Sequence, residues 1–323
     1  MSDETDLMHR AAWLYYLGGL NQEETAARLG TTRARVNRLL SEAREAGVVS
    51  ITIDTAETGL LAVEEAIAAG FGLNRVITTP ELGLGDLAGR PQKLRDFPRR
   101  AVGSAAARLL RDLLAQNPRL CVGTGWGRTL DQMTRHLAGV RAPHGRFVSL
   151  MGSLTANSAF NPFDVVQALA RKTGGDGHFL PVPFLADTAE DRAVLLSQRS
   201  VVTVFEMARR ADVAFISVGE LTEGSLLRTS GMISAGEMAA LCKAGAVGDT
   251  NGLFFDAAGR PVDHALNQRT LAVGLDDLAA GRAILLAAGV EKVAATHALL
   301  RSGAIDTLII DGDAARALAT AMG

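Results

Sequence analysis

Cysteine is scarce in this chain of 323 residues: there are only two, Cys121 and Cys242, and they form no Cys-x-x-Cys pair. Two distant cysteines in apolar surroundings argue against a disulfide framework and against a cysteine-based metal site. The six histidines show no metal-ligand spacing either. We therefore expect two buried free thiols, a reducing compartment and no bound metal.

Long hydrophobic runs are also missing. No apolar stretch reaches the roughly 20 residues that a membrane-spanning helix needs. The first ten residues hold three acids where a secretion signal would have an apolar core. The net charge is only −2, so contact with a nucleic acid would have to come from a local basic region. These absences predict a cytoplasmic protein without a membrane partner.

Enzyme motifs are absent as well. The chain has no P-loop ending in Gly-Lys-Ser/Thr, no nucleophile elbow, no Ser/His/Asp set and no paired catalytic carboxylates. We expect no catalytic residue and no cofactor. The composition is that of an ordinary globular protein, with 48% apolar and 21% charged residues. The length suits a small module joined to a domain of roughly 250 residues.

Residues 20–47 have the pattern of two helices joined by a tight turn. Apolar residues recur with helical spacing on both sides of Gly30-Thr31-Thr32. Gly30 is a typical helix C-cap, and a threonine directly after it can cap the next helix. This is the helix-turn-helix arrangement, which seats its second helix in the DNA major groove. The polar face of that helix carries the residues expected to bind DNA: Thr32, Arg33, Arg35, Asn37 and Arg38.

Charge along this stretch separates DNA binding from the alternatives. Between Arg28 and Arg44 there are five arginines and one acid, Glu42. An amphipathic hairpin with a solvated basic face, or a protein-interaction module, would also fit a helix pair. Positive charge confined to one helix of a slightly acidic protein favours DNA. Arginine can then bond guanine and asparagine can bond adenine.

The segment 48–53 alternates β-branched residues and predicts a short strand, either a wing or a joint. The polar residues 54–59 make a plausible boundary. We therefore expect a winged helix-turn-helix domain at 1–54 and an effector and oligomerisation domain at 55–323.

Beyond residue 73, short apolar strands alternate with helices, which predicts an α/β domain with a mostly parallel sheet covered on both faces. The expected strands lie near 75–79, 120–123, 146–151, 178–182, 213–218, 283–288 and 306–310. The expected helices are 60–72, 98–116, 128–138, 162–173, 199–210, 235–244, 290–302 and 313–321, and an earlier one spans 5–18. The Gly- and Pro-rich residues 80–97 are expected to form a loop.

A glycine-rich loop, Gly123-Thr-Gly-Trp-Gly-Arg-Thr129, directly follows a predicted strand and opens a predicted helix. Glycines such as Gly125 and Gly127 let a backbone approach a ligand, and free amides at a helix N-terminus favour an anion. Arg128 and Thr129 add a cation and a hydroxyl, which suits a phosphate group. The alternative is a simple tight turn.

Polar residues follow other strands of the predicted sheet, where ligands of such folds bind. Lys292 opens a helix, where the macrodipole opposes a cation unless an anion is near. Each residue alone could be merely solvated, and His178 could be a core or surface histidine. The candidates for effector contacts at these strand ends are Met151, Gly152, Ser153, His178, Arg228, Asp249 and Lys292.

Taken together, the two halves resemble the SorC family of bacterial sugar-responsive transcriptional regulators, over roughly residues 8–320. The resemblance depends on the order and spacing of six segments. They are LNQEETAARLGTTRARVNRLLSEAREAGVVSI, GTGWGRTL, SLMGS, ARRADVAFISVGE, GAVGDTNGLFFDAAGRPV and GVEKVAATHALLRSGAIDTLIIDGDAA.

The resemblance implies a winged helix-turn-helix joined to a domain similar to glucosamine-6-phosphate deaminase and ribose-5-phosphate isomerase. That domain kept a sugar-phosphate pocket and generally lost catalysis. By position, it implies phosphate contacts from Gly127, Arg128 and Thr129, a second loop at 151–153, and further contacts from Asp249 and Lys292. Arg228 and His178 fall near family ligand positions. Two departures from the family pattern are Arg128 itself and Ile310-Asp311-Gly312, where relatives often read Thr-Asp-Glu.

We therefore expect a transcriptional regulator of a carbohydrate or polyol catabolic operon, controlled by a phosphorylated sugar or polyol. A single DNA-binding module makes few contacts, so a homodimer or homotetramer on repeated half-sites is expected. The alternative from the enzyme class is a sugar-phosphate isomerase or deaminase with an extra helical module.

Overall fold

The fold was analysed in a computed structural model, which describes residues 3–49, 51, 60–85, 87, 89–153 and 161–322. The chain forms two compact units, an N-terminal unit of residues 1–53 and a C-terminal unit of residues 54–323. Each unit is described by itself. None of the described helices has the length and apolarity that a membrane span requires.

The N-terminal unit is helical. Its elements are α1 (Asp3–Ala12), a π-helix (Trp13–Leu17), α2 (Gln22–Leu29) and α3 (Arg33–Glu45). Gly30 ends α2 in the left-handed conformation, with φ of 63°. Thr32 begins α3, where its hydroxyl accepts a hydrogen bond from the Arg35 amide at 3.2 Å. The predicted helix, turn and helix are confirmed, because both ends depend on local caps that the sequence carries.

A small core holds these helices together. Ala11 of α1 and Ala26 of α2 are buried against Val36, Leu39 and Leu40 of α3. The apolar spacing that predicted the second helix is therefore the face that packs. Of the strand predicted at 48–53, the first two residues form a bend, and residues 50, 52 and 53 lie outside the described part of the chain. A wing stays a prediction.

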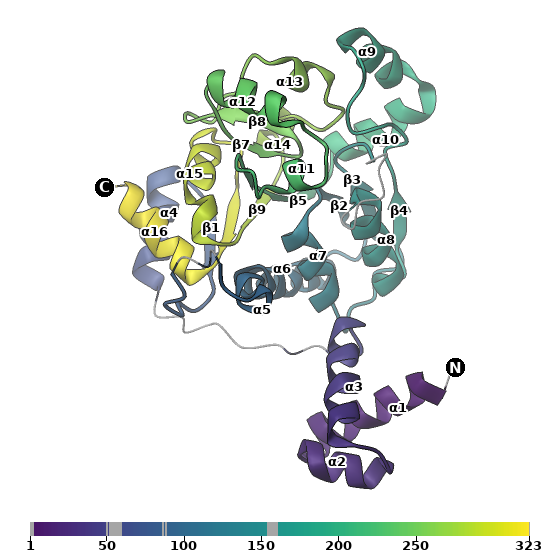
Figure 1. The fold of residues 1–323 in the computed structure, drawn as a ribbon. Coiled ribbons are helices and arrows are strands. Elements are labelled where there is room, and N and C mark those ends of the chain that lie inside the picture. Colours follow the sequence, from purple (N-terminus) through teal and green to yellow (C-terminus); the bar gives the residue numbers. More distant parts are fainter. Residues whose placement is uncertain are drawn as a thin grey trace. The chain divides into compact units, whose positions relative to one another are not determined.

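The C-terminal unit is built on a seven-stranded parallel sheet (Figure 1). In spatial order its strands are β1 (Arg75–Thr78), β10 (Thr307–Ile310), β9 (Ala283–Ala287), β5 (Val213–Ser217), β2 (Cys121–Thr124), β3 (Arg146–Ser149) and β4 (Asp176–His178). From β2 the chain winds outward to β3 and β4, and from β5 it winds the other way to β9 and β10. The direction of winding thus reverses between β2 and β5, which defines a topological switch point.

A three-stranded antiparallel sheet adjoins the large one. It consists of β6 (Gly219–Glu220), β7 (Ala246–Thr250) and β8 (Leu253–Asp256), with β7 in the centre. Thr250 pairs with Leu253, so Asn251 and Gly252 form a two-residue hairpin turn. Both turn residues have positive φ, 50° and 74°, as a type I′ turn requires. This sheet was not predicted from the sequence.

Helices cover both faces of the large sheet, as predicted. One face is packed by α6 (Phe97–Gln116), α7 (Arg128–His136) and α8 (Pro162–Thr173). The other is packed by α4 (Leu61–Phe71), α10 (Arg199–Arg209), α14 (Leu275–Ala279), α15 (Val293–Arg301) and α16 (Gly312–Met322). The other described α-helices of this unit are α5 (Gln92–Arg95), α9 (Ala189–Ser197), α11 (Leu226–Thr229), α12 (Ala235–Lys243) and α13 (Ala265–Arg269).

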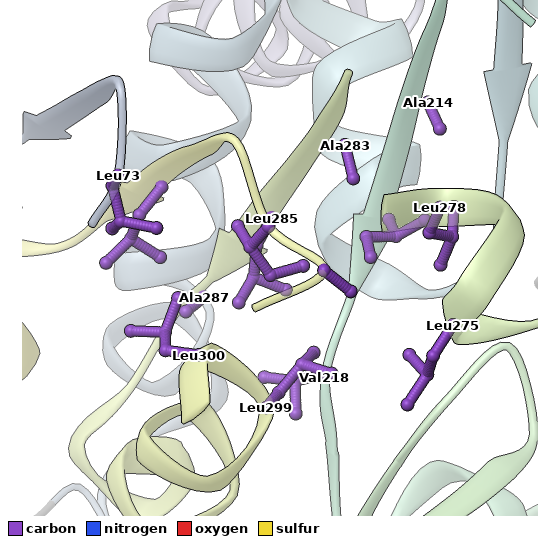
Figure 2. Close-up of a cluster of buried hydrophobic side chains, with 14 of the residues drawn as sticks. Leu73, Ala214, Val218, Leu275, Leu278, Ala283, Leu285, Ala287, Leu299 and Leu300 are labelled. Carbon is purple, nitrogen blue, oxygen red and sulfur yellow. The ribbon is translucent and has the colours of Figure 1, made fainter. Parts of the chain in front are cut away.

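Alternate residues of each buried strand pack against the helices on opposite faces of the sheet. In β5, Val213 and Phe215 join the cluster under α6, whereas Ala214 and Ile216 join the opposite cluster. Figure 2 shows that opposite cluster, in which side chains of β9 lie with Leu299 and Leu300 of α15. Burial on both sides explains why the strands read as continuous apolar runs.

Three predictions about this unit were wrong. The strand predicted at 178–182 ends at His178, because Pro181 and Pro183 supply no amide donors for a ladder. The loop predicted at 80–97 contains α5 and the start of α6. Cys121 is a buried thiol, as predicted, but Cys242 is exposed, because it lies on the outer side of α12.

Helices α6 and α7 approach closely at Gly103. A Cβ there would lie 2.5 Å from the Gln132 Cβ and 2.8 Å from the Met133 amide nitrogen. We predict that Gly103→Ala destabilises the protein by about 1–3 kcal/mol, because backbone must move to relieve the overlap. Thermal unfolding measures this, with Gln116→Ala, at an exposed position of the same helix, as control. Equal midpoints for the two variants would contradict the close packing.

Candidate functional site

The carboxyl ends of β9, β5 and β2, three adjacent strands, surround one cavity, here called the strand-end cavity. Its empty space is about 470 Å3 when the open solvent at its mouth is included. Its walls are formed by Trp126, Gly127, Arg128, Thr129, Ser217, Val218, Gly219, Glu220, Ser225, Leu226, Leu227, Asp249, Asn251 and Lys292. The position is the one at which open α/β sheets bind ligands.

The glycine-rich loop after β2 forms one wall. Its backbone is tied to β5, since the Gly125 amide donates to the Phe215 carbonyl at 2.9 Å and the Ser217 hydroxyl donates to the Trp126 carbonyl at 3.1 Å. Gly127 has φ of 115°, a conformation that L side chains rarely adopt. It is the N-cap of α7 and provides no side chain to cap it.

Two acids reach the cavity from the small sheet. After β5 the chain leaves the large sheet and forms β6, which carries Glu220 and pairs with β7, the strand of Asp249. Gly219 makes this possible, because a Cβ there would lie 2.0 Å from a carboxylate oxygen of Asp249. The Gly252 amide donates to the Asp249 carboxylate at 3.0 Å.

Lys292 enters from the loop after β9, in a 3-10 turn (Val290–Lys292) that precedes α15. Its side chain is buried, and its Nζ donates to the Val218 carbonyl at 2.7 Å and lies 3.6 Å from Glu220. The sequence predicts an anion near Lys292, and in the structure that anion is Glu220 of the protein itself. Asp311, after β10, accepts a hydrogen bond from the Gly289 amide at 2.7 Å, so the last loop supports the Lys292 loop.

Burial is the largest cause of the pKa shifts of these groups. Asp249 is only 5% exposed, and burial raises its pKa to about 6, although the Gly252 amide and Lys292 oppose that rise. Burial lowers the pKa of Lys292, while Glu220 raises it. The pKa of Arg128 is lowered by burial and then by the neighbouring Arg99 guanidinium.

Arg128 differs from Lys292 in having no carboxylate within ion-pair distance among the described residues. Arg99 is held by Asp96 at 3.0 Å and by Glu291 at 3.6 Å. Of the two cations that line the cavity, only Arg128 therefore has its charge available to a ligand.

In the N-terminal unit, the predicted DNA contacts lie together on α3. Thr32, Arg33, Arg35, Asn37 and Arg38 are all exposed. Glu4 of α1 lies 3.0 Å from Arg38 and 3.7 Å from Arg35. The two arginines therefore share one carboxylate on the surface of the unit.

Known proteins match this chain over the C-terminal unit and over nearly its whole length. Residues 56–320 match the family described as "Putative sugar-binding domain". The chain is 39% identical over 319 residues to the erythritol catabolism regulatory protein EryD of Brucella abortus, with 98% of each chain covered. It is 30% identical over 321 residues to the deoxyribonucleoside regulator of Bacillus subtilis, again with 98% of each covered. The chain belongs to the SorC family of transcriptional regulators.

A solved structure supports the fold of this SorC-family chain. The full-length sorbitol operon regulator SorC from Klebsiella pneumoniae superposes with a TM-score of 0.70 at 23% identity, covering 98% of this chain and 100% of that one. The predicted combination of a mostly parallel α/β sheet with an N-terminal helical unit is confirmed. The predicted family and the role as a transcriptional regulator are confirmed as well.

The structure gathers some of the effector contacts predicted for a SorC-family protein and separates others. Gly127, Arg128, Thr129, Asp249 and Lys292 line the strand-end cavity. Gly125 lies directly behind its wall, because a Cβ there would meet the Asn251 side chain at 2.4 Å. The other candidates, Met151, Gly152, Ser153, His178 and Arg228, are not among its lining residues.

These other candidates have different surroundings. Met151 is fully buried in a cluster with Trp126, and the amides of the next two residues donate to the Leu271 and Val182 carbonyls. His178 ends the edge strand β4. Arg228 pairs with Glu223 at 3.2 Å. Two lining residues that sequence reasoning missed are Ser225 and Asn251; the second could have been found from its Asn-Gly turn, two residues after Asp249.

The pKa of Asp249 generates a prediction about stability. The folded-state pKa of about 6 exceeds the ordinary value of 3.8, so the folded protein holds this proton more tightly than the unfolded chain. Burying the carboxylate costs nothing below pH 4 or so, and the cost grows with pH until it is complete above about pH 6. We predict that Asp249→Asn stabilises the protein by about 3 kcal/mol at pH 7.5.

Urea unfolding between pH 4 and pH 8 measures this effect. The gain from Asp249→Asn should shrink as the pH falls towards 4. Asp187→Asn, at an exposed position, is the control for loss of a carboxylate that is not buried. A gain that is absent at pH 7.5, or that grows towards pH 4, would contradict the burial of an ionised carboxylate.

Proposed function

We propose that this chain regulates a carbohydrate or polyol catabolic operon in the cytoplasm by binding operator DNA through α3 and a phosphorylated sugar or polyol in the strand-end cavity. The observation that carries the proposal is the cavity at the switch point, with an available cation at a helix N-terminus, in a chain that also contains a helix-turn-helix. The name of the Brucella abortus relative, an erythritol catabolism regulator, supports a polyol pathway.

The cavity suits an anionic group on its α7 side. Gly127 offers no side chain to cap the first amides of α7, and uncapped amides at a helix N-terminus attract anions. Arg128 adds a fork of donors that matches a phosphate. Gly127, Arg128 and Thr129 are therefore the proposed phosphate contacts, and Asp249 and Lys292 line the same cavity.

The exposed face of α3 suits DNA. Arg35, Asn37 and Arg38 lie on the exposed face and suit base edges once DNA displaces Glu4 from the two arginines. Thr32 and Arg33 at the helix start suit phosphates. One such helix buries little surface, so we propose that a dimer or tetramer presents several copies to repeated half-sites. Effector binding would then alter DNA affinity if it favours one arrangement of subunits over another.

We propose a binding role for the strand-end cavity rather than catalysis. The names of the full-length relatives, a regulatory protein and a regulator, support this choice over an isomerase or deaminase. No metal or cofactor is required by the proposal. Turnover of common sugar phosphates by the full chain would argue for the enzyme alternative.

The proposed effector binding is tested by thermal unfolding in the presence of phosphorylated and free sugars and polyols. A compound that binds only the folded state raises the midpoint according to its concentration over its Kd. We predict that phosphorylated compounds raise the midpoint. Arg128→Gln should weaken their binding by about tenfold or more, because a charged hydrogen-bond donor is lost.

The control for this experiment is Arg135→Gln, which removes the same charge from the far end of α7, where Arg135 pairs with Asp131 at 2.7 Å. It should leave ligand affinity unchanged. If only free polyols raise the unfolding midpoint, and Arg128→Gln does not change this rise, the proposed phosphate contacts are contradicted.

The proposed DNA contact is tested at Glu4, whose carboxylate competes with DNA for Arg35 and Arg38. We predict that Glu4→Gln tightens binding to duplex DNA by about two- to fivefold at low salt, with less gain as salt rises, since exposed ion pairs are weak and screened. Fluorescence anisotropy of a labelled duplex measures the affinity. Replacing both arginines by Ala should weaken binding strongly.

Asp6→Asn is the matched control, because it makes the same charge change on α1 while Asp6 contacts Arg10 at 3.9 Å and not α3. Equal effects of Glu4→Gln and Asp6→Asn on DNA affinity would show that Glu4 acts only through the net charge of the protein and not through its pairing with the two arginines. Undiminished binding after loss of both arginines would exclude them from the DNA contact.

A further inference from the structure

Two polar side chains in the wall of the strand-end cavity have no partner. Ser225 is 2% exposed and Asn251 is 3% exposed. Within the described part of the chain, neither the Ser225 hydroxyl nor the Asn251 amide nitrogen makes a hydrogen bond. A buried polar group without a partner destabilises a protein, so such groups in a native fold call for an explanation.

Local structure does not account for these two groups. Ser225 precedes α11 as its N-cap residue, yet its side chain caps nothing. The conformation of Asn251 is explained by its hairpin turn, but that turn makes no use of the side-chain amide. The amide oxygen lies against Gly125, where a Cβ would be only 2.4 Å away. The missing side chain at Gly125 therefore makes room for this amide beside the cavity.

The charges around these groups indicate which ligand atoms they meet. Glu220 is already paired with Lys292, so Asp249 is the acid with capacity to accept from a ligand. It lies two residues before Asn251, and both residues line the cavity. A phosphate placed there would be repelled by the carboxylate. A hydroxyl can donate to Asp249 while accepting from Asn251 or Ser225, because it is both donor and acceptor.

We propose that Ser225 and Asn251, together with Asp249, form a hydroxyl-binding subsite for the unphosphorylated part of the effector, which is a short phosphorylated polyol. The anionic end of that ligand lies at Arg128. This assignment rests on the proposed function of the cavity and adds to it the groups that distinguish a polyol chain from a bare phosphate.

The test compares two probes, erythritol 4-phosphate and inorganic phosphate, by calorimetric titration of the full chain. The variants are Ser225→Ala and Asn251→Gly; glycine tolerates the positive φ of the turn and removes the side chain with its amide. Each should lower affinity for erythritol 4-phosphate by about five- to tenfold and leave affinity for inorganic phosphate unchanged. Thr222→Ala, an exposed hydroxyl on the loop before Ser225, should change neither.

The outcomes separate this subsite from the proposed function. An equal loss for both probes would assign Ser225 and Asn251 to the phosphate end and overturn the subsite, while the phosphate site would stand. Unchanged affinity for both probes would also overturn it. Binding of inorganic phosphate but not of erythritol 4-phosphate by the unaltered protein would exclude the short-polyol class. Binding of neither probe would overturn the phosphate site and the subsite together.

Discussion

Lys292 is a cation almost wholly removed from water. The strand ends around it supply a hydrogen-bond acceptor and a carboxylate for its charge. A buried ammonium needs hydrogen-bond acceptors and a counter-charge. The Val218 carbonyl and Glu220 provide them, which depends on the chain leaving the large sheet after β5 to form β6. The pairing of β6 with β7 then carries Asp249 to the same cavity. One buried charge thus links the large sheet, the small sheet and the ligand-facing groups.

Much of the C-terminal unit could be predicted because its strands are buried on both faces and its helices follow them regularly. The small sheet is not predicted from the sequence, although Asn251-Gly252 is a strong hairpin signal. Its strands are short, and from the sequence Asp249 is assigned only a ligand contact. Ser225 could not be found from sequence. Its position depends on how α11 folds over the cavity, and nothing nearby in the chain distinguishes it from other loop serines.

The N-terminal unit was more predictable for a physical reason. The caps at Gly30 and Thr32 act within a few residues, so the sequence specifies where α2 ends and α3 begins. The contact of Glu4 with Arg35 and Arg38 depends instead on how α1 packs across α3, which spacing alone does not reveal. The same distinction applies to Lys292: the sequence indicated a nearby anion, but only the fold identifies that anion as Glu220.

In the proposed regulation, ligand binding in the strand-end cavity changes DNA binding by α3. The most direct measurement is the affinity of the full chain for duplex DNA from upstream of its own coding sequence, titrated with and without saturating erythritol 4-phosphate. We predict that the ligand changes the DNA affinity, and that the DNA changes the ligand affinity by the same factor, as linkage requires. Identical DNA affinity in both titrations, with the ligand demonstrably bound, would contradict it.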